Sequence, residues 1–247
     1  MSARYPDLEN RVVFITGGAS GIGAAFVEAF AGQGAKTAFI DLNEKAGEAL
    51  ARRVHGWFRR VDVTDAAALK NAVADAAAHY GALDVLINNV ANDQRHDAAD
   101  LDEKGWRDRL AVNLDPVLHA SVAAYEVMSP VQRGVIINIS SINALLGPAR
   151  LTAYVAAKGA INAMTKSLAH EWGAANIRVN VISPGWVVTE RQLKLWLTPE
   201  AEAEWMKQVA LQKRIMPADV ANLALFLASD ASALITGQNY VIDGGRT

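Results

Sequence analysis

Short runs of apolar, β-favouring residues alternate along this 247-residue chain with Ala-rich amphipathic stretches. The alternation predicts strands at residues 12–16, 36–41, 57–61, 83–88, 134–140, 178–183 and 239–243. It predicts helices at residues 21–32, 43–54, 65–80, 102–128, 154–172 and 217–228. Strands that are apolar along their whole length are typical of a parallel sheet covered on both faces. With no linker between the units, we predict an α/β fold with one doubly wound domain over residues 1–247.

Composition excludes several classes of function. The chain has no cysteine, so we expect no disulfide, no thiolate chemistry and no cysteine metal site, which fits a cytoplasmic protein, and we nominate no metal-binding residue. A net charge of −2 without a basic block argues against a nucleic-acid partner. The first ten residues lack the apolar core of a signal peptide, and no apolar run approaches the roughly 20 residues that span a bilayer.

A glycine-rich segment follows the first predicted strand and precedes the first predicted helix. It reads Thr16-Gly-Gly-Ala-Ser-Gly-Ile-Gly23. Glycines allow a sharp turn and a close approach of the backbone to a pyrophosphate, and the helix N-terminus supplies free N–H groups. In this context the segment predicts a dinucleotide site.

Asp41, at the end of the second predicted strand, indicates which dinucleotide is bound. A carboxylate there can accept hydrogen bonds from the adenosine ribose hydroxyls and would repel a 2′-phosphate. Position 20, inside the glycine-rich segment, carries serine and not a cation that could hold that phosphate. We therefore predict NAD as the cofactor, with the alternative that Asp41 is only a turn or helix-capping acid.

Other polar residues follow the third and fourth predicted strands. Asp62, in Val61-Asp62-Val63, is positioned to meet the adenine edge, although Asp65 could equally serve that region as a helix N-cap. Asn88 and Asn89 lie at the carboxyl edge of the sheet, where open α/β sheets bind ligands, or they are turn residues.

Tyr154 and Lys158 are four residues apart on a predicted helix and so share one face. An ammonium beside a phenol favours the phenolate, and a tyrosine tuned in this way can exchange a proton with an alcohol or carbonyl oxygen. The hydroxyl of Ser141, from a nearby strand end, could hold the same oxygen. Taken alone, the pair could also be an exposed aromatic and a solvated lysine.

Together these residues resemble the classical short-chain dehydrogenase/reductases over essentially the full chain. The resemblance rests on the glycine-rich segment, Asp62, the Asn88-Asn89 pair, Asn113, Ser141, Tyr154-x-x-x-Lys158 and Pro184-Gly185-x-x-x-Thr189. It implies one Rossmann-type domain with a seven-stranded parallel sheet and NAD(P)-dependent redox chemistry.

The resemblance also implies roles for individual residues. Tyr154 is the acid/base, Lys158 lowers its pKa and binds the nicotinamide ribose, Ser141 orients the reacting oxygen, and Asn113 holds a water that connects Lys158 to solvent. The implied cofactor-binding residues are Gly17, Ser20, Gly21, Ile22, Gly23, Asp41, Asp62, Val63, Asn89, Tyr154, Lys158, Pro184, Gly185, Val187 and Thr189. The family usually reads Asn-Asn-Ala-Gly after the fourth strand, whereas Ala91 replaces that glycine here.

The segments expected around the substrate are polar and include one indole, Trp186. Such a set suits a sugar ring, since an indole stacks on C–H faces and polar side chains bind hydroxyls. The Asn-Asp-x-Arg-His segment at 92–96 and the stretch before Trp196 resemble bacterial aldose 1-dehydrogenases, such as D-xylose dehydrogenases. The implied reaction oxidises the C1 hydroxyl of an aldose, such as xylose, arabinose, galactose or fucose, to a lactone. The nominated substrate contacts are Asn92, Ser141, Asn143, Tyr154, Trp186, Arg191 and Gln192.

Several alternatives remain open from the sequence. Arg95 and His96 could be structural, holding their loop by pairing with acids such as Asp93 or Asp97. The protein could be a polyol or other secondary-alcohol dehydrogenase, a 3-oxoacyl reductase, or a non-catalytic NAD-binding module, although the last would be expected to have lost the Ser-Tyr-Lys set.

Two further expectations concern the substrate segment and the assembly. The irregular segment 184–215 is expected to close over the substrate as a lid. A homotetramer is implied through helices 102–128 and 154–172, whose Ala-rich faces would equally suit packing on the chain's own sheet.

Overall fold

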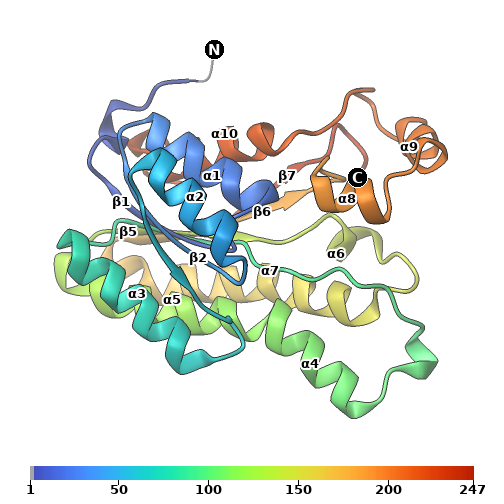
Figure 1. Ribbon diagram of the computed structural model, residues 1–247, viewed down its shortest axis with the longest axis horizontal. Coiled ribbons are helices and arrows are strands. Elements are labelled where there is room, and N and C mark those ends of the chain that lie inside the picture. The colour runs from blue at the N-terminus through green and yellow to red at the C-terminus, as the bar shows by residue number, and fades with distance from the viewer. Residues whose placement is uncertain (1–2) are drawn as a thin grey trace.

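The computed structural model describes residues 3–247, which form one α/β domain (Figure 1). The strands are β1 (Val12–Thr16), β2 (Lys36–Asp41), β3 (Trp57–Arg60), β4 (Val85–Asn88), β5 (Gly134–Ile139), β6 (Ile177–Pro184) and β7 (Asn239–Ile242). The helices are α1 (Gly21–Gly32), α2 (Glu44–Val54), α3 (Ala66–Tyr80), α4 (Glu103–Asn113), α5 (Asp115–Met128), α6 (Asn143–Leu146), α7 (Thr152–Trp172), α8 (Glu190–Leu195), α9 (Pro199–Met206) and α10 (Pro217–Ala228).

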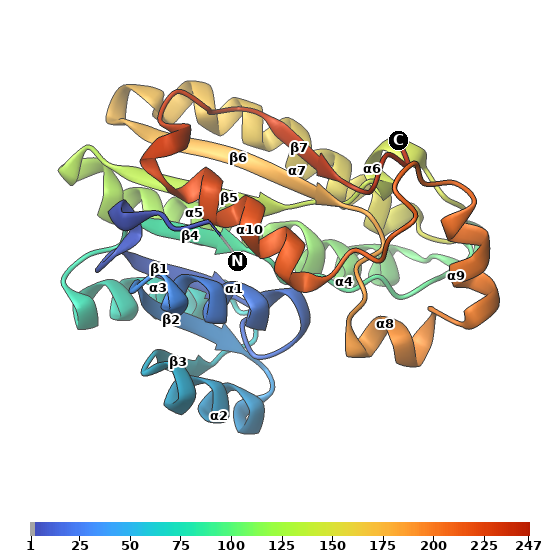
Figure 2. The same ribbon diagram turned by 90° about the horizontal axis from the view of Figure 1, so that it is seen from above.

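The described strands form a single parallel sheet in the order β3-β2-β1-β4-β5-β6-β7 (Figure 2). The chain winds outward from β1 to β3 and then returns to place β4 beside β1. This reversal confirms the predicted doubly wound, seven-stranded parallel sheet. Sheets of this kind bind ligands beyond the carboxyl ends of the strands at such a reversal, which here lies between β1 and β4.

Helices cover both faces of the sheet. Helices α1, α2 and α10 lie on one face, and α3, α5 and α7 lie on the other (Figure 1). Alternate residues of β1 therefore enter different cores: Val13 and Ile15 pack toward the first face, and Val12 and Phe14 toward the second. Because neither face meets water, β1 is buried at every residue, as its continuous apolar sequence predicts.

The predicted helix 102–128 is wrong as a single helix, because it divides into α4 and α5. Leu114, between the two, departs from helical geometry with φ −126° and ψ −57°. Pro116 stands in the first turn of α5, and proline has no N–H to continue a helix and clashes with the preceding turn. The chain therefore bends here, which turns α4 away toward the carboxyl edge of the sheet (Figure 1).

The segment 184–215 contains helices of its own. Thr189 and Thr198 cap α8 and α9 by accepting hydrogen bonds from backbone N–H groups in the first turns. Both helices lie beyond the carboxyl ends of β6 and β7 (Figures 1 and 2). Among residues 3–247 no helix has the length and hydropathy required to cross a bilayer.

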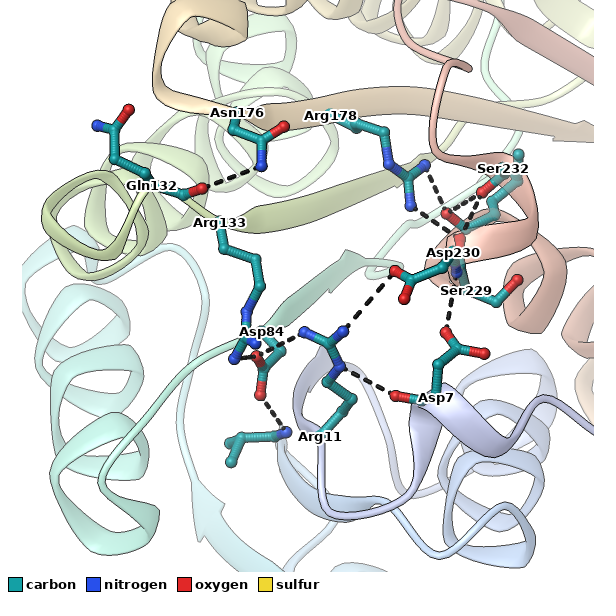
Figure 3. Close-up of polar contacts among 12 residues, drawn as sticks. Asp7, Arg11, Asp84, Gln132, Arg133, Asn176, Arg178, Ser229, Asp230 and Ser232 are labelled. Carbon is teal, nitrogen blue, oxygen red and sulfur yellow. Dashed lines mark hydrogen bonds and ion pairs between the residues drawn. The ribbon is translucent and has the colours of Figure 1, made fainter.

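A polar network occupies the opposite, amino edge of the sheet (Figure 3). The buried carboxylate of Asp84 accepts hydrogen bonds from the Val12 N–H at 2.8 Å, from Arg11 Nη1 at 3.2 Å and from Arg133. Arg11 also donates to the Asp7 carbonyl at 3.0 Å. Asp84 therefore joins the chain segments that lead into β1, β4 and β5.

Asp84→Asn is expected to lower the free energy of unfolding by roughly 2–4 kcal/mol, because both arginines lose a buried charged partner. Urea denaturation measures this loss. The control is Glu48→Gln, which removes an exposed pair with Arg52 and should change stability by less than about 1 kcal/mol. An equal loss in the two variants would contradict a structural role for the amino-edge network.

Candidate active site

The glycine-rich loop between β1 and α1 is shaped by close contacts between its own atoms. Gly17 has φ +67°, a conformation that other residues rarely adopt. A Cβ on Gly23 would lie 1.9 Å from the Gly17 carbonyl oxygen, so only glycine allows the start of α1 to approach this turn. Ser20 precedes the helix without capping it through its side chain. The first N–H groups of α1, around Gly21 and Ile22, thus form a cradle suited to a pyrophosphate.

Asn89, directly after β4, braces this cradle. Its side-chain amide donates to the carbonyl of Thr16 at 3.0 Å and to that of Gly17 at 3.2 Å. Its backbone N–H donates to the Thr16 hydroxyl at 2.9 Å. Asn88 has a different role, because its buried side chain donates to Asn138 at 2.9 Å and Ser121 at 3.1 Å inside the core. Of the pair, Asn89 alone contacts the predicted cofactor loop.

Asp41 ends β2 next to the cradle. One carboxylate oxygen accepts the Ala19 N–H at 3.0 Å, and the other accepts the Asn43 N–H at 2.9 Å. Asn43 is the N-cap of α2, so Asp41 is not the helix cap that the sequence left open. The carboxylate is held at the mouth of the cradle, half-buried, with remaining lone pairs on both oxygens.

Asp62 and Asp65 have separate roles after β3. Asp65 is the N-cap of α3 and accepts the Ala68 N–H at 2.9 Å. Asp62 is exposed and accepts from the backbone N–H and the hydroxyl of Thr64 at 2.9 and 2.8 Å. Val63 between them is buried. Asp62 is therefore free of the capping role and remains available at this edge of the sheet.

Ser141, Tyr154 and Lys158 come together where β5 meets α7. Ser141 hydrogen-bonds the Tyr154 phenol, and its Oγ also accepts the Asn143 N–H at 3.1 Å. Lys158 is 1 % exposed, and its Nζ lies 5.6 Å from the centre of the Tyr154 ring. The Nζ donates to the Ile139 carbonyl at 2.7 Å, which fixes the lysine below the tyrosine.

Burial dominates the electrostatics of this trio. Loss of hydration raises the pKa of Tyr154 to about 12, while the hydrogen bond from Ser141 lowers it and the negative charge of Asp93 raises it. Burial also lowers the pKa of Lys158 to about 7. The sequence predicts instead that the lysine charge lowers the tyrosine pKa. The four-residue spacing of Tyr154 and Lys158 predicts that they share a helix face. It does not predict that both groups lose their hydration.

Asn113, at the end of α4, is fully buried and binds the loop after β4. Its amide donates to the Asn92 carbonyl at 3.1 Å and to the Arg109 carbonyl at 3.0 Å, and its oxygen accepts the Asn92 N–H at 2.8 Å. These bonds make Asn113 a clamp on the backbone of Asn92. The water relay that the family resemblance implies for Asn113 stays a prediction.

Four of the predicted substrate residues form one polar wall between the loop after β4 and the start of α8, namely Asn92, Trp186, Arg191 and Gln192. Arg191 donates to Asn92 Oδ1 at 3.3 Å and pairs with Asp93 at 3.2 Å. Gln192 donates to the other oxygen of Asp93 at 2.8 Å and accepts the Trp186 indole N–H at 2.8 Å. Asp93, which the sequence analysis did not nominate, therefore lies at the centre of this wall.

The remaining predicted residues surround the same region. Pro184 ends β6, Gly185 donates its N–H to the Ile242 carbonyl at 2.9 Å, and Val187 pairs with Ile215. A Cβ on Gly21 would lie 3.4 Å from Thr189 Cγ2, so Thr189 lies beside the start of α1. The segment after β6 therefore adjoins the glycine-rich cradle.

Arg95 and His96 hold their loop, as the structural alternative proposed, but their partners are not acids. The Arg95 guanidinium lies 4.4 Å from the centre of the Trp196 ring. The Ala153 N–H points at His96 Nε2 at 3.4 Å, directly before Tyr154. Ala91 is exposed and is not in the left-handed region, so the backbone here does not require the family's usual glycine.

Known proteins show which family these residues belong to. The family described as "Enoyl-(Acyl carrier protein) reductase" matches residues 17–247. A probable galactose dehydrogenase of Rhizobium meliloti is 42 % identical over 250 residues, covering 99 % of this chain and 98 % of the relative. The chain belongs to the short-chain dehydrogenase/reductase family.

Further relatives in the short-chain dehydrogenase/reductase family cover almost the whole chain. A D-xylose 1-dehydrogenase of Caulobacter vibrioides is 42 % identical, covering 99 % of this chain and 98 % of the relative. A D-threitol dehydrogenase of Mycolicibacterium smegmatis is 38 % identical, covering 97 % and 94 %. The structure of a short-chain type dehydrogenase/reductase from Mycobacterium ulcerans superposes with a TM-score of 0.93 at 25 % identity, covering 99 % of this chain and 91 % of that one.

Membership of the short-chain dehydrogenase/reductase family makes this protein an oxidoreductase that acts on CH–OH groups with a nicotinamide cofactor. The chain's own residues fit such a group. The cradle excludes any side chain at Gly23, Asn89 braces it, and Asp41 stands at its mouth. Within residues 3–247, no cluster of histidine and carboxylate groups is arranged to hold a metal ion.

Lys158→Met is expected to raise the free energy of unfolding, because it removes a buried amine with a pKa near 7. Between pH 7 and the ordinary lysine pKa, the unfolded chain binds more protons than the native one, so native stability rises with pH. The gain from methionine is therefore largest at pH 6, and it shrinks by roughly 2 kcal/mol by pH 9.

Urea unfolding at the two pH values measures this difference. Lys166→Met is the control, because Lys166 is exposed on the same helix. A gain of the same size at pH 6 and pH 9 would contradict the burial of an ionisable lysine.

Proposed function

We propose that this protein oxidises the anomeric C1 hydroxyl of an aldose to a lactone, with NAD as the hydride acceptor. The aldose is a pentose or hexose such as xylose, arabinose, galactose or fucose. The observation that carries the proposal is the polar wall of Asn92, Asp93, Arg191, Gln192 and Trp186, whose charge reaches Tyr154. A ring with several hydroxyls can hydrogen-bond to such a wall, whereas a fatty-acyl chain or steroid would cover its polar groups without pairing them.

The relatives support the same substrate class. The galactose and D-xylose 1-dehydrogenases share 42 % of their residues with this chain over nearly all of it. The second of these is named for oxidation at C1. Since sugars differ from one another by the orientation of single hydroxyls, the identity of the aldose depends on individual contacts within the polar wall.

The proposed mechanism assigns each step to a residue of the chain. When bound, a nicotinamide cofactor would supply the acceptor for the hydride of C1. Tyr154, as the phenolate, takes the proton of the C1 hydroxyl, and Ser141 holds that oxygen through its own hydroxyl. Lys158 is fixed by the Ile139 carbonyl, with its Nζ 5.6 Å from the centre of the Tyr154 ring, and it would hold the ribose hydroxyls of the cofactor. Asn113 keeps the Asn92 backbone in position at the edge of the substrate site.

The proton balance sets the direction of the pH dependence. Oxidation releases one hydride and one proton from the sugar, and Tyr154 must be ionised to receive the proton. Because burial raises the pKa of Tyr154, oxidation is favoured by alkaline pH.

The proposal also includes closure of a lid over the substrate and assembly of the protein into an oligomer. Residues 184–215 close over the sugar as a lid, since α8 and α9 lie at the carboxyl edge and α8 carries one side of the polar wall. The protein forms a homotetramer through the faces of α4, α5 and α7.

A polyol dehydrogenase is the second candidate. The D-threitol dehydrogenase relative favours it, and the polar wall would bind the hydroxyls of an open-chain polyol as well. The reacting carbon would then carry a secondary alcohol, and the product would be a ketose. A 3-oxoacyl reductase is a weaker candidate, because Asp41 opposes NADPH and the polar wall does not suit an acyl chain.

A panel of aldoses and polyols tests the function, with NADH formation followed at 340 nm. We expect NAD-dependent oxidation that is strongest on one or two aldoses. Tyr154→Phe should lower kcat by roughly 10²- to 10⁴-fold while NADH binding, measured by fluorescence, is unchanged. Tyr80→Phe, on the distant helix α3, is the control and should keep its activity.

The outcomes separate the candidates. Oxidation of polyols but not of aldoses would show that the protein oxidises a secondary alcohol and not the C1 hydroxyl of an aldose. No oxidation of either class, with NADH still bound, would refute the sugar proposal.

The cofactor preference is tested at Asp41. Asp41→Asn removes the charge that repels a 2′-phosphate, so the ratio of kcat/KM with NAD to that with NADP should fall roughly 10- to 100-fold. Asp65→Asn keeps a good helix cap and should leave the ratio unchanged. If wild-type protein already prefers NADP, the assignment of NAD is wrong.

A further inference from the structure

Asp93 connects two parts of the chain that lie on opposite sides of the substrate region. Its side chain is 26 % exposed, and each carboxylate oxygen has its own partner on α8. Oδ1 pairs with Arg191 at 3.2 Å, and Oδ2 accepts from Gln192 at 2.8 Å. The hydrogen bond to Gln192 spans 99 residues of sequence, so it joins the loop after β4 to the segment after β6.

The connection continues beyond Gln192 to the indole of Trp186. The Gln192 side-chain oxygen accepts the Trp186 N–H at 2.8 Å while its amide donates to Asp93. Trp186 also packs edge-on against Trp205 of α9, with ring centres 5.8 Å apart. One carboxylate therefore orients a guanidinium, an amide and, through that amide, an indole.

Asp93 uses only some of the hydrogen-bond donors that it orients. A guanidinium has five N–H groups and an amide has two. Arg191 directs a single nitrogen at Asp93 and Asn92, and Gln192 uses one amide bond to Asp93. The remaining donors, and further lone pairs on Asp93, can bind hydroxyl groups of a substrate.

The same carboxylate acts on the reacting centre. The pKa of Tyr154 is raised by burial, lowered by the hydrogen bond from Ser141 and raised by the negative charge of Asp93. Asp93 is thus near enough to Tyr154 for its charge to be felt there.

We propose that Asp93 is a specificity-determining positioning residue, which holds Arg191, Gln192 and Trp186 in the arrangement that selects a polyhydroxylated substrate. The inference rests on the proposed function and names the residue that gives the site its preference for sugars. Asp93 contributes little to stability, because Arg191 is 53 % exposed and ion pairs at the surface are weak. Its effect therefore falls on substrate binding.

The test compares Asp93→Asn with Asp97→Asn. Asp97 lies in the same loop and pairs with the exposed Arg150 at 3.1 Å, away from α8, so it is a matched control. The substrates are the best aldose and tetrahydropyran-2-ol, a cyclic hemiacetal that has the C1 hydroxyl and no other. Both substrates undergo the same oxidation to a lactone, and they differ only in the hydroxyls available to the polar wall.

Asp93→Asn should lower kcat/KM for the aldose roughly 10- to 100-fold, mainly through KM, and change the value for tetrahydropyran-2-ol less than about threefold. Asp97→Asn should leave both values unchanged. Equal losses on the two substrates, or a loss confined to kcat, would overturn the proposal. Asp93→Ala, in which no acceptor remains, should show an effect at least as large as Asp93→Asn.

Hydrogen exchange of the full chain with NADH bound gives a readout that does not depend on turnover. Backbone amides of residues 186–197 should exchange faster in Asp93→Asn and Asp93→Ala than in wild type or Asp97→Asn. Unchanged exchange would refute the positioning role. If wild type oxidises no aldose while exchange responds as expected, the proposed function fails and the positioning of α8 by Asp93 stands.

Discussion

The burial of the sheet on both faces is the constraint on which the rest of this structure depends. Strands covered by helices on each side are largely apolar, as β1 is, and the polar side chain of Asn138 in β5 is bonded to Asn88 and Thr165 inside the core. Polar chemistry is thereby displaced to the two ends of the strands. At the amino edge it becomes the network around Asp84, and at the carboxyl edge it becomes the cofactor cradle and the polar wall. The residues that we expect to stabilise the fold and those proposed to carry the chemistry therefore lie at opposite edges of the sheet.

Local periodicity predicted the sheet, its helices and the pairing of Tyr154 with Lys158, because these depend on neighbours in sequence. The bend at Leu114 was missed, although Pro116 signals it within the printed sequence. The tie from Asp93 to α8 could not be predicted, since it joins residues 99 positions apart that only the folded sheet brings together. Short helices such as α6 and α8 likewise depend on tertiary contacts more than on their own propensity.

The pKa values of Tyr154 and Lys158 likewise could not be predicted from the sequence. The spacing of Tyr154 and Lys158 predicts an ammonium that assists a phenolate. Burial acts on both groups at once, and it disfavours the charged form of each. In the proposed mechanism, this cost keeps Tyr154 and Lys158 out of water, and electrostatic interactions are stronger in the protein interior than in water. Residue types alone indicate the attraction between an ammonium and a phenolate, whereas the loss of hydration of both groups depends on the fold.

The long-range tie at Asp93 also has a kinetic consequence. Bringing together residues 99 positions apart costs chain entropy, which no nearby contact repays until β4, β5 and β6 are assembled. We therefore expect the wall at α8 to form late in folding and to open more easily than the sheet. Natural variation in this wall can change substrate preference while the folding rate of the sheet, set by earlier contacts, stays nearly constant.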